Sequence, residues 1–170
     1  MSVWFDFDEV DAFTVGALGR PGARTFFLQV RRGSTVVTVK CEKQQAAAIA
    51  QYLRRVLSDL PEPAVRPVDG AMELADPVEA AFVLGPVGLG YDRGTDMVLV
   101  QLDEVPALDE DGEAVEDDDD ERGHLRLFVT RSQAVAFCSR ADDVVSSGRP
   151  ACRWCQGPID PDGHACPRMN

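Results

Sequence analysis

Apolar and polar residues follow one another along the chain in patterns that predict five strands. The runs RTFFLQV (Arg24–Val30) and TVVTVKC (Thr35–Cys41) are rich in β-branched and aromatic residues, and the turn sequence RRGS between them predicts a hairpin. AAFVLGPVGLGY and DMVLVQLDEV form a second pair, joined by the turn residues 92–95, and HLRLFVT predicts a further strand. These five segments indicate a protein rich in β-structure.

Two other segments carry the spacing of an amphipathic helix. Between Glu42 and Leu60 the apolar residues fall on one helical face: Ile49, Leu53, Val56, Leu57 and Leu60. Pro61 ends this helix, because proline cannot supply the backbone N–H that a continuing helix needs. Thr130 and Gln133 form a capping-box pattern, which predicts a second helix from Ser132 to about Ser147.

The order strand, strand, helix occurs twice, and the two helix starts are alike. EKQQAAAI (Glu42–Ile49) aligns with TRSQAVAF (Thr130–Phe137) at an offset of 88, which suggests an internal ββα duplication, with chance similarity as the alternative. Each helix has one apolar face and must cover one face of a sheet. The fold class predicted is therefore α+β, with an antiparallel sheet of about six or seven strands covered by two helices. This domain should span residues 1–149, and residues 150–170 should form a separate tail.

The formal net charge of −12 belongs to one stretch of the sequence. Between Asp103 and Glu121 there are 12 acidic residues and no lysine or arginine, whereas the rest of the chain is neutral. Like charges in a row repel one another and leave no apolar face to bury, which predicts a flexible, solvated loop at about residues 105–122. A solubilising insertion is the simplest interpretation, and a segment that binds cations or a basic partner is the alternative.

Membrane spans and secretion signals are not expected. No apolar run approaches the roughly 18–20 residues that cross a bilayer. The first residues, MSVWFDFDEV, carry acids where a signal peptide carries bases followed by an apolar stretch. We therefore expect a cytoplasmic protein, and in the reducing cytoplasm clustered cysteines bind metal more often than they form disulfides.

The last nineteen residues hold four of the seven cysteine and histidine side chains. Cys152 and Cys155 form a Cys-x-x-Cys pair, and eight residues later His164 and Cys166 form a His-x-Cys pair. The sequence DPDG at 160–163 is typical of a type I turn that would bring the second pair back to the first. Three thiolates and one imidazole select zinc over magnesium or calcium. The sequence therefore predicts one zinc ion per chain in a zinc-ribbon-like knuckle.

A structural zinc ion fits this pattern better than a catalytic one. Catalytic zinc sites have three protein ligands and leave a position for water, whereas four ligands are present here. A deaminase would pair its Cys-x-x-Cys with an earlier His-x-Glu, but the other histidine of this chain lies in the sequence GHLR. A tail of about twenty residues cannot bury a core of its own, and metal binding substitutes for that core.

Other candidate residues have structural interpretations. The glycine-rich GPVGLG (Gly85–Gly90) lacks the nucleotide-binding patterns and lies between predicted strands, so a bulged strand is expected. Cys41 and Cys138 are expected to be small buried hydrophobic residues. His124 stands at the edge of the acidic stretch, without an evident nucleophile as partner.

Several segments together resemble a known sequence family. GRPGARTFFLQV, CEKQQAAAIAQYL, LGYD, TRSQAVAF and GRPACRWCQGPIDPDGHACPRMN are similar to an uncharacterised actinobacterial family, whose β-rich body ends in Cys-x-x-Cys-Gly…Gly-His-x-Cys-Pro-Arg-x-Asn. The resemblance covers nearly the whole chain except the acidic loop. One departure is Gln156, where the family usually has a glycine, which relieves backbone strain. The family is associated with the partition-associated protein ParJ, a partner of ParA-type chromosome-segregation ATPases, so the resemblance implies an intracellular protein of open biochemical role.

Three classes of function stay open at this point. We favour a non-enzymatic adaptor or regulatory protein that acts through protein–protein contacts, with a ParA-type ATPase as the partner that the resemblance implies. The alternative is an enzyme or enzyme subunit whose site has no local sequence signature. A nucleic-acid-binding zinc ribbon ranks third, because Arg153 and Arg168 beside the ligands are a small basic footprint in a chain of net charge −12.

Overall fold

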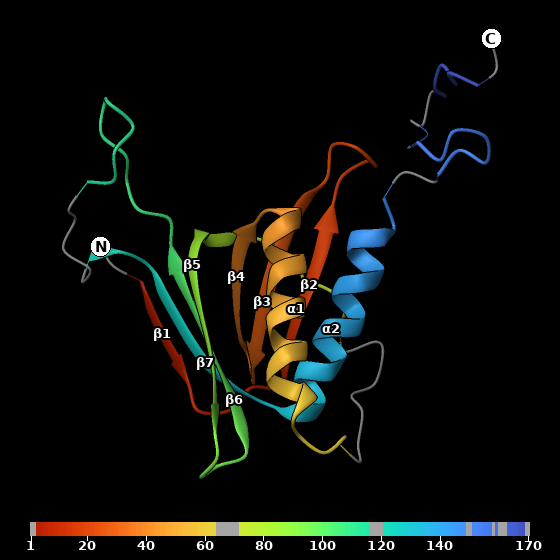
Figure 1. Ribbon diagram of the computed structural model, residues 1–170. Coiled ribbons are helices and arrows are strands. Elements are labelled where there is room, and N and C mark those ends of the chain that lie inside the picture. Colours follow the sequence, from red (N-terminus) through yellow and green to blue (C-terminus); the bar gives the residue numbers. More distant parts are fainter. Residues whose placement is uncertain are drawn as a thin grey trace.

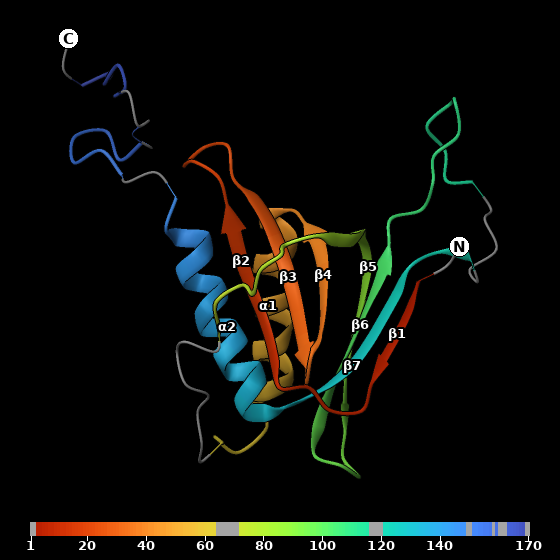
Figure 2. The same cartoon turned by 180° about the vertical axis from the view of Figure 1, so that it is seen from behind.

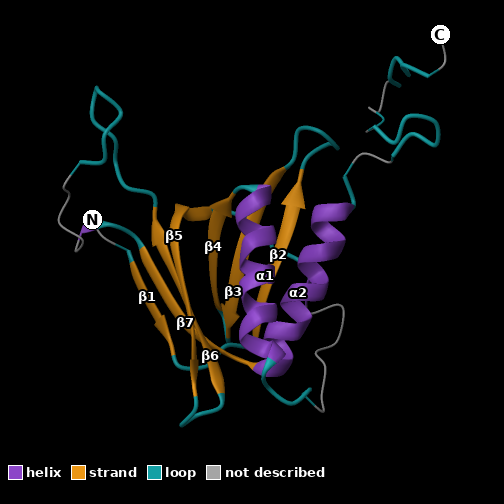
Figure 3. Ribbon diagram, in the orientation of Figure 1, coloured by secondary structure: helices purple, strands orange, loops and turns teal. Residues whose placement is uncertain are grey.

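The computed structural model describes residues 3–63, 72–115, 121–148, 151–157, 159 and 163–168. Within these residues, seven strands form one sheet in the order β1-β7-β6-β5-β4-β3-β2. The strands are β1 (Trp4–Phe7), β2 (Ala12–Leu18), β3 (Thr25–Arg32), β4 (Thr35–Cys41), β5 (Ala80–Asp92), β6 (Met97–Glu104) and β7 (His124–Thr130). Two helices, α1 (Lys43–Ser58) and α2 (Arg131–Ser146), lie side by side on the same face of this sheet (Figures 1 and 3).

The α+β class with its two helices is confirmed, but the sheet is mixed rather than wholly antiparallel. β1 pairs with β7 and β4 pairs with β5 in parallel, whereas the other neighbouring strands are antiparallel. The β4–β5 pairing is parallel because α1 lies between these strands in sequence and returns the chain to the end where β4 began. β1 and β2 are strands that the apolar pattern did not identify.

Both helices begin with a capping box, in which a glutamine in the first turn bonds back to the residue before the helix. Oε1 of Gln45 accepts the backbone N–H of Glu42 at 2.8 Å, and Oε1 of Gln133 accepts that of Thr130 at 2.9 Å. These bonds satisfy N–H groups that the helix itself leaves without partners. The capping box predicted for the second helix is confirmed.

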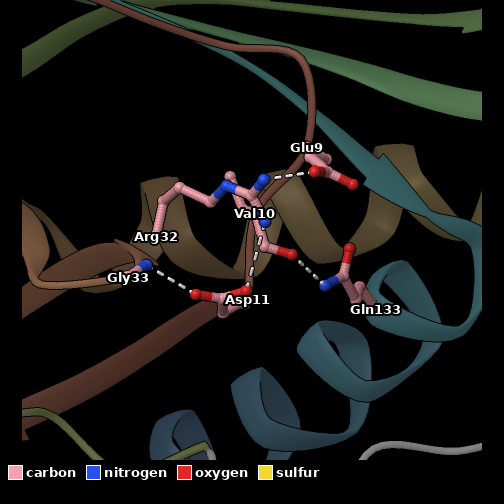
Figure 4. Close-up of polar contacts among 6 residues, drawn as sticks. All are labelled: Glu9, Val10, Asp11, Arg32, Gly33 and Gln133. Atoms are coloured by element: carbon pink, nitrogen blue, oxygen red, sulfur yellow. Dashed lines mark hydrogen bonds and ion pairs between the residues drawn. The ribbon is translucent and has the colours of Figure 1, made fainter.

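The same two glutamines fasten each helix to the sheet layer. Nε2 of Gln45 donates to the carbonyl of Leu84 in β5 at 3.1 Å, and Nε2 of Gln133 donates to the carbonyl of Val10 before β2 at 2.7 Å. Figure 4 shows the second contact, beside the ion pairs of Arg32 with the two residues that flank Val10. Each helix therefore starts at a fixed position beside a strand.

The offset of 88 also relates the buried positions of the two strand–helix units, although the ββα duplication is only partly matched. The buried residues of β4 and α1 are Val37, Val39, Cys41, Ala46, Ile49, Ala50 and Leu53, and their counterparts are Leu125, Leu127, Val129, Ala134, Phe137, Cys138 and Ala141. The offset does not extend to the preceding strands. The link between β3 and β4 is residues 33–34, whereas the link between β6 and β7 is residues 105–123.

The helices pack against each other and against β2 at the centre of the core. Phe137 of α2 stacks on Phe13 of β2 with ring centroids 4.4 Å apart and both rings buried. Between the helices, Sγ of Cys138 donates to the carbonyl of Ala50 at 3.4 Å. These contacts exclude water from the helical face of the sheet.

A short extended segment covers the opposite face of β2, β3 and β4. Figure 2 shows this segment, which follows residue 71, as an olive trace that crosses β2 and β3. Gln29 of β3 holds it through a paired contact, because its Nε2 donates to the carbonyl of Ala75 at 3.0 Å and its Oε1 accepts the N–H of Ala75 at 2.8 Å. Thr14 donates to the carbonyl of Met72. Buried polar side chains of the strands thus pair with the backbone of the segment.

The glycine-rich run in β5 forms the bulge that the sequence predicted. The pairing of β5 with β6 shifts register between Leu84 and Val87. Gly85 lies in this interval, and a Cβ atom added there would be 2.7 Å from Cα of Val105. A side chain at this position would therefore displace the backbone that follows β6.

The acidic stretch begins as a turn closed by its own backbone. Residues 107–115 fold back on themselves through an isolated bridge between Leu108 and Ala114, and Oδ1 of Asp109 accepts two backbone N–H groups. At the base, the carboxylate of Glu104 accepts the N–H of Gly123 at 2.7 Å.

Two predictions from the sequence are not tested by this fold. Residues 116–120 of the predicted flexible loop lie outside the described residues. The division of the chain at residue 149 stays a prediction. No helix in the described part of the chain is long and apolar enough to cross a membrane.

Replacing Gln29 tests the role of the segment on the opposite face. Gln29→Ala should lower the free energy of unfolding by about 3 kcal/mol, because the N–H and carbonyl of Ala75 lose their partners. The melting temperature should then fall by roughly 6–12 °C. Gln51→Ala, at an exposed position of α1, is the control and should change stability by less than about 0.5 kcal/mol. Thermal unfolding followed by circular dichroism measures both, and equal small shifts would contradict this role for Gln29.

Candidate metal centre

The four predicted ligands come together in the tail that follows α2. One ligand atom from each of Cys152, Cys155, His164 and Cys166 lies within 4.8 Å of all the others. Cys152 Sγ is 3.9 Å from Cys166 Sγ, and Cys155 Sγ is 3.4 Å from His164 Nε2. Figure 1 shows this tail beyond the end of α2, away from the sheet. The two pairs separated in sequence therefore form one cluster.

The dimensions of this cluster fit a single metal ion. In a tetrahedral site with metal–sulfur bonds of about 2.3 Å, neighbouring sulfur atoms lie about 3.8 Å apart, and a sulfur and a nitrogen about 3.5 Å apart. The observed 3.9 Å and 3.4 Å agree with these edges. Thiolate and imidazole are also the donors that borderline-soft divalent ions prefer. The group of four could therefore hold a metal ion.

The first pair lies in a tight turn that directs backbone N–H groups at sulfur. The N–H of Cys152 donates to the carbonyl of Gly157 at 2.7 Å, which closes the turn. The N–H groups of Cys155 and Trp154 lower the pKa of the Cys152 thiol from 9.0 to about 7. Because metal ions bind the thiolate, this shift favours the form that a ligand must have near neutral pH.

Gln156 occupies a backbone conformation that favours glycine. Its φ angle is 61°, in the left-handed region, and its N–H donates to the carbonyl of Cys152 at 2.8 Å. A side chain in this region costs about 1–2 kcal/mol relative to an ordinary backbone conformation. This is the position at which the sequence departs from the glycine of the resembling family, and the geometry explains why glycine suits it.

The second half of the tail is tied to the first through Arg168. Nη1 of Arg168 donates to the carbonyl of Trp154 at 3.1 Å, so Arg168 lies against the first turn. Gly163 precedes His164 with φ of 94°, which a glycine adopts without strain. The predicted type I turn falls largely on residues 160–162, outside the described residues. In the sequence Arg168 stands out only as a base beside the ligands, and its contact with Trp154 has no local signal.

The other two cysteines are separate from the cluster and have the structural role predicted for them. Cys41 and Cys138 are both buried in the core. Burial raises the pKa of the Cys41 thiol to about 12 and that of Cys138 to about 11. Both stay protonated at neutral pH and act as small apolar side chains.

His124 has a carboxylate partner that sequence analysis missed. Its Nδ1 lies 2.7 Å from Oδ1 of Asp103, and the two side chains are 14% and 21% exposed. The pair forms because β6 and β7 place these residues opposite each other, while Trp4 of β1 lies beside the histidine with ring centroids 4.8 Å apart. The residues are 21 positions apart in sequence, so only the strand register could reveal the contact.

Comparison with known proteins places the chain in a family without an assigned activity. A family model described as "Protein of unknown function (DUF3090)" matches residues 5–166, and the chain belongs to this family. The match includes both helices, all four candidate ligands and the whole sheet except Trp4. Neither the curated proteins nor the solved structures give a significant match. The expected membership in an uncharacterised family is therefore confirmed, and its function has to be inferred from the residues themselves.

Metal content of ligand variants tests the cluster. The protein should bind one divalent ion per chain, and Cys155→Ser or Cys166→Ser should weaken binding by at least about a hundredfold, because even residues that only support ligands contribute about tenfold to a hundredfold. Cobalt titration followed by visible absorption reports both affinity and tetrahedral geometry. Cys41→Ala and Cys138→Ala are the matched controls and should keep full binding. Undiminished cobalt binding by either tail variant would show that the cluster is not the metal site.

A second variant tests the strain at residue 156. We expect a bound metal ion to hold residue 156 in the left-handed conformation more strictly than the metal-free tail does. Gln156→Gly should therefore tighten metal binding by about fivefold, since glycine relieves roughly 1 kcal/mol of strain in that conformation. Gln156→Ala keeps a Cβ atom and should bind within about twofold of the wild type. Competition with a chromogenic chelator measures the affinities. Equal affinity in the glycine and alanine variants would show that the backbone angle has no part in holding the site.

Proposed function

We propose that this protein is a non-enzymatic adaptor or regulatory protein whose tail, held by a structural zinc ion, contacts a protein partner. The observation that carries the proposal is the convergence of four ligand side chains in a turn that also exposes a tryptophan. Zinc is the ion that three thiolates and one imidazole favour among the metals available in cells.

A structural role for the ion follows from the number of ligands. Four protein ligands fill a tetrahedral shell and leave no position at which water or substrate could bind. With three thiolates and a neutral imidazole the site has a net charge of −1, so it is a poor electrophile. The energy of metal binding then stabilises the fold of a segment that has few apolar residues.

The tail offers side chains that are common in protein interfaces. Trp154 is 50% exposed, and the guanidinium carbon of Arg153 lies 4.9 Å from the centroid of its ring. Arg168 binds the backbone of the same residue. Tryptophan and arginine dominate binding energy at protein–protein interfaces, where they fill pockets in the partner. We assign Trp154 and Arg153 as the centre of the contact surface.

The resemblance to an actinobacterial, partition-associated family suggests the partner. A ParA-type ATPase is the candidate, and the protein would then act in the cytoplasm of an actinobacterium. Nucleic acid is disfavoured as a partner, because a net charge of −12 repels phosphate backbones and the two tail arginines offer little to offset it.

Metal analysis provides the first test. Protein purified from its native host without chelator should contain zinc at one ion per chain, and Cys152→Ala should abolish it. Another metal in this position, or zinc retained by the variant, would contradict the assignment of zinc.

Binding to a ParA-type ATPase from the same genome provides the second test. Trp154→Ala should weaken the complex by at least about tenfold, as expected for an aromatic side chain at the centre of an interface. Trp4→Ala is the matched control, since Trp4 is the other tryptophan of the chain and is 59% exposed on β1. Biolayer interferometry with ATP present measures both. Failure of the wild type to bind, or equal effects of the two substitutions, would contradict the proposed partner surface.

A further inference from the structure

A cavity of about 400 Å³ lies where three parts of the body meet, next to the start of the tail. Its lining includes Arg24, Phe26, Lys43, Ser146 and Gly148. Figure 1 shows the β2–β3 turn, the start of α1 and the end of α2 together at this end of the molecule. The cavity is separate from the metal centre, and no role proposed above uses it.

Two cationic side chains of this cavity face a common point. A Cβ atom added to Gly148 would be 3.5 Å from Nη2 of Arg24 and 3.9 Å from Nζ of Lys43. Both cationic groups therefore lie close to Gly148, and a ligand in the cavity can contact both of them because no side chain at position 148 separates them. Any larger residue at position 148 would fill the space between them.

Arg24 is held in place for such a contact. Its Nη1 donates to Oγ of Ser147 at 3.0 Å and its Nη2 donates to the carbonyl of Val144 at 3.2 Å. Its guanidinium carbon lies 5.3 Å from the ring centroid of Phe26. A guanidinium has five N–H donors, so these bonds fix its orientation and leave donors for a ligand. A fixed cation loses little conformational freedom when an anion binds.

Lys43 adds an unused charge at the start of α1. Its ammonium group forms no hydrogen bond or ion pair with any residue that the structure describes. It is the first residue of α1, where the helix dipole also favours an anion. Asp143 lines a smaller cavity that shares Arg24. Among the described residues, the main cavity is lined by the two cationic side chains and by no acidic one.

We propose that this cavity binds a phosphate dianion, either free or as the monoester of a small organic molecule. The two cations neutralise its charge through charge-assisted hydrogen bonds, which are the strong kind. The cavity is larger than a phosphate ion, and Phe26 and Val145 provide apolar wall for the organic part of a monoester. Gly148 precedes the first metal ligand by four residues, so a ligand here would lie at the junction of body and tail.

Calorimetric titration of the full-length, metal-loaded protein tests this proposal. Inorganic phosphate and glycerol 3-phosphate are the probes, at constant ionic strength set by sodium chloride. Lys43→Ala should weaken binding by at least about tenfold, because one charge-assisted contact is lost. Gly148→Ala should do the same by placing a methyl group between the cations. The fold should stay undisturbed, because the nearest atoms to the new methyl carbon are at 3.5 Å and 3.9 Å, which is ordinary van der Waals contact. Lys40→Ala is the matched control, since Lys40 and Lys43 are the two lysines of the chain.

The outcomes separate the proposal from general charge effects. Tighter binding of glycerol 3-phosphate than of phosphate supports the monoester, and equal binding supports the free anion. Amide signals of Gly148 and Lys43 should shift during the titration in two-dimensional NMR spectra. Absence of saturable binding of both probes up to about 20 mM, or equal weakening by Lys40→Ala and Lys43→Ala, would overturn the site.

Discussion

The packing of α1 against α2 on one face of the sheet is the interaction on which the body of this protein depends. Both helices bury equivalent positions, and each is fixed at its start by a glutamine that bonds to the layer below. The stack of Phe13 on Phe137 joins the second helix to the edge strand β2. With the helices in place, Val98, Val100 and Leu102 of β6 are fully buried. The alternating apolar side chains of the strands are shielded from water because this helical layer covers them.

The tail is stabilised in a different way. It packs no helix or strand onto the body among the described residues, and its internal contacts join the four candidate ligands to one another and the backbone of the first turn to itself. A segment this short gains little from apolar burial to offset its loss of conformational freedom, and in the proposed function a metal ion supplies the difference. The body and the tail are therefore expected to depend on separate sources of stability, even though they are joined through Gly148 at the phosphate-binding cavity.

Local patterns in the sequence predicted those features that local chemistry determines. The two helices, the capping box of the second helix, the bulge at Gly85 and the four clustered ligands each have a signal within about twenty residues. The parallel pairings, the segment held by Gln29 and the contact of His124 with Asp103 have no such signal, because they join residues far apart in sequence. The sequence pattern did not identify β2, because this strand is buried on both faces and lacks alternation. It also did not indicate the phosphate-binding cavity, because Arg24, Lys43 and Gly148 meet only in the folded chain.

We propose that a metal ion holds the tail in its fold and that the body folds without the ion. Two-dimensional amide NMR spectra of the metal-loaded protein, recorded before and after a chelator removes the ion, test both statements. Signals of residues 151–157 and 163–168 should lose their dispersion, whereas those of β2 to α2 should keep their positions. Unchanged tail signals, or loss of dispersion throughout the sheet and helices, would contradict it.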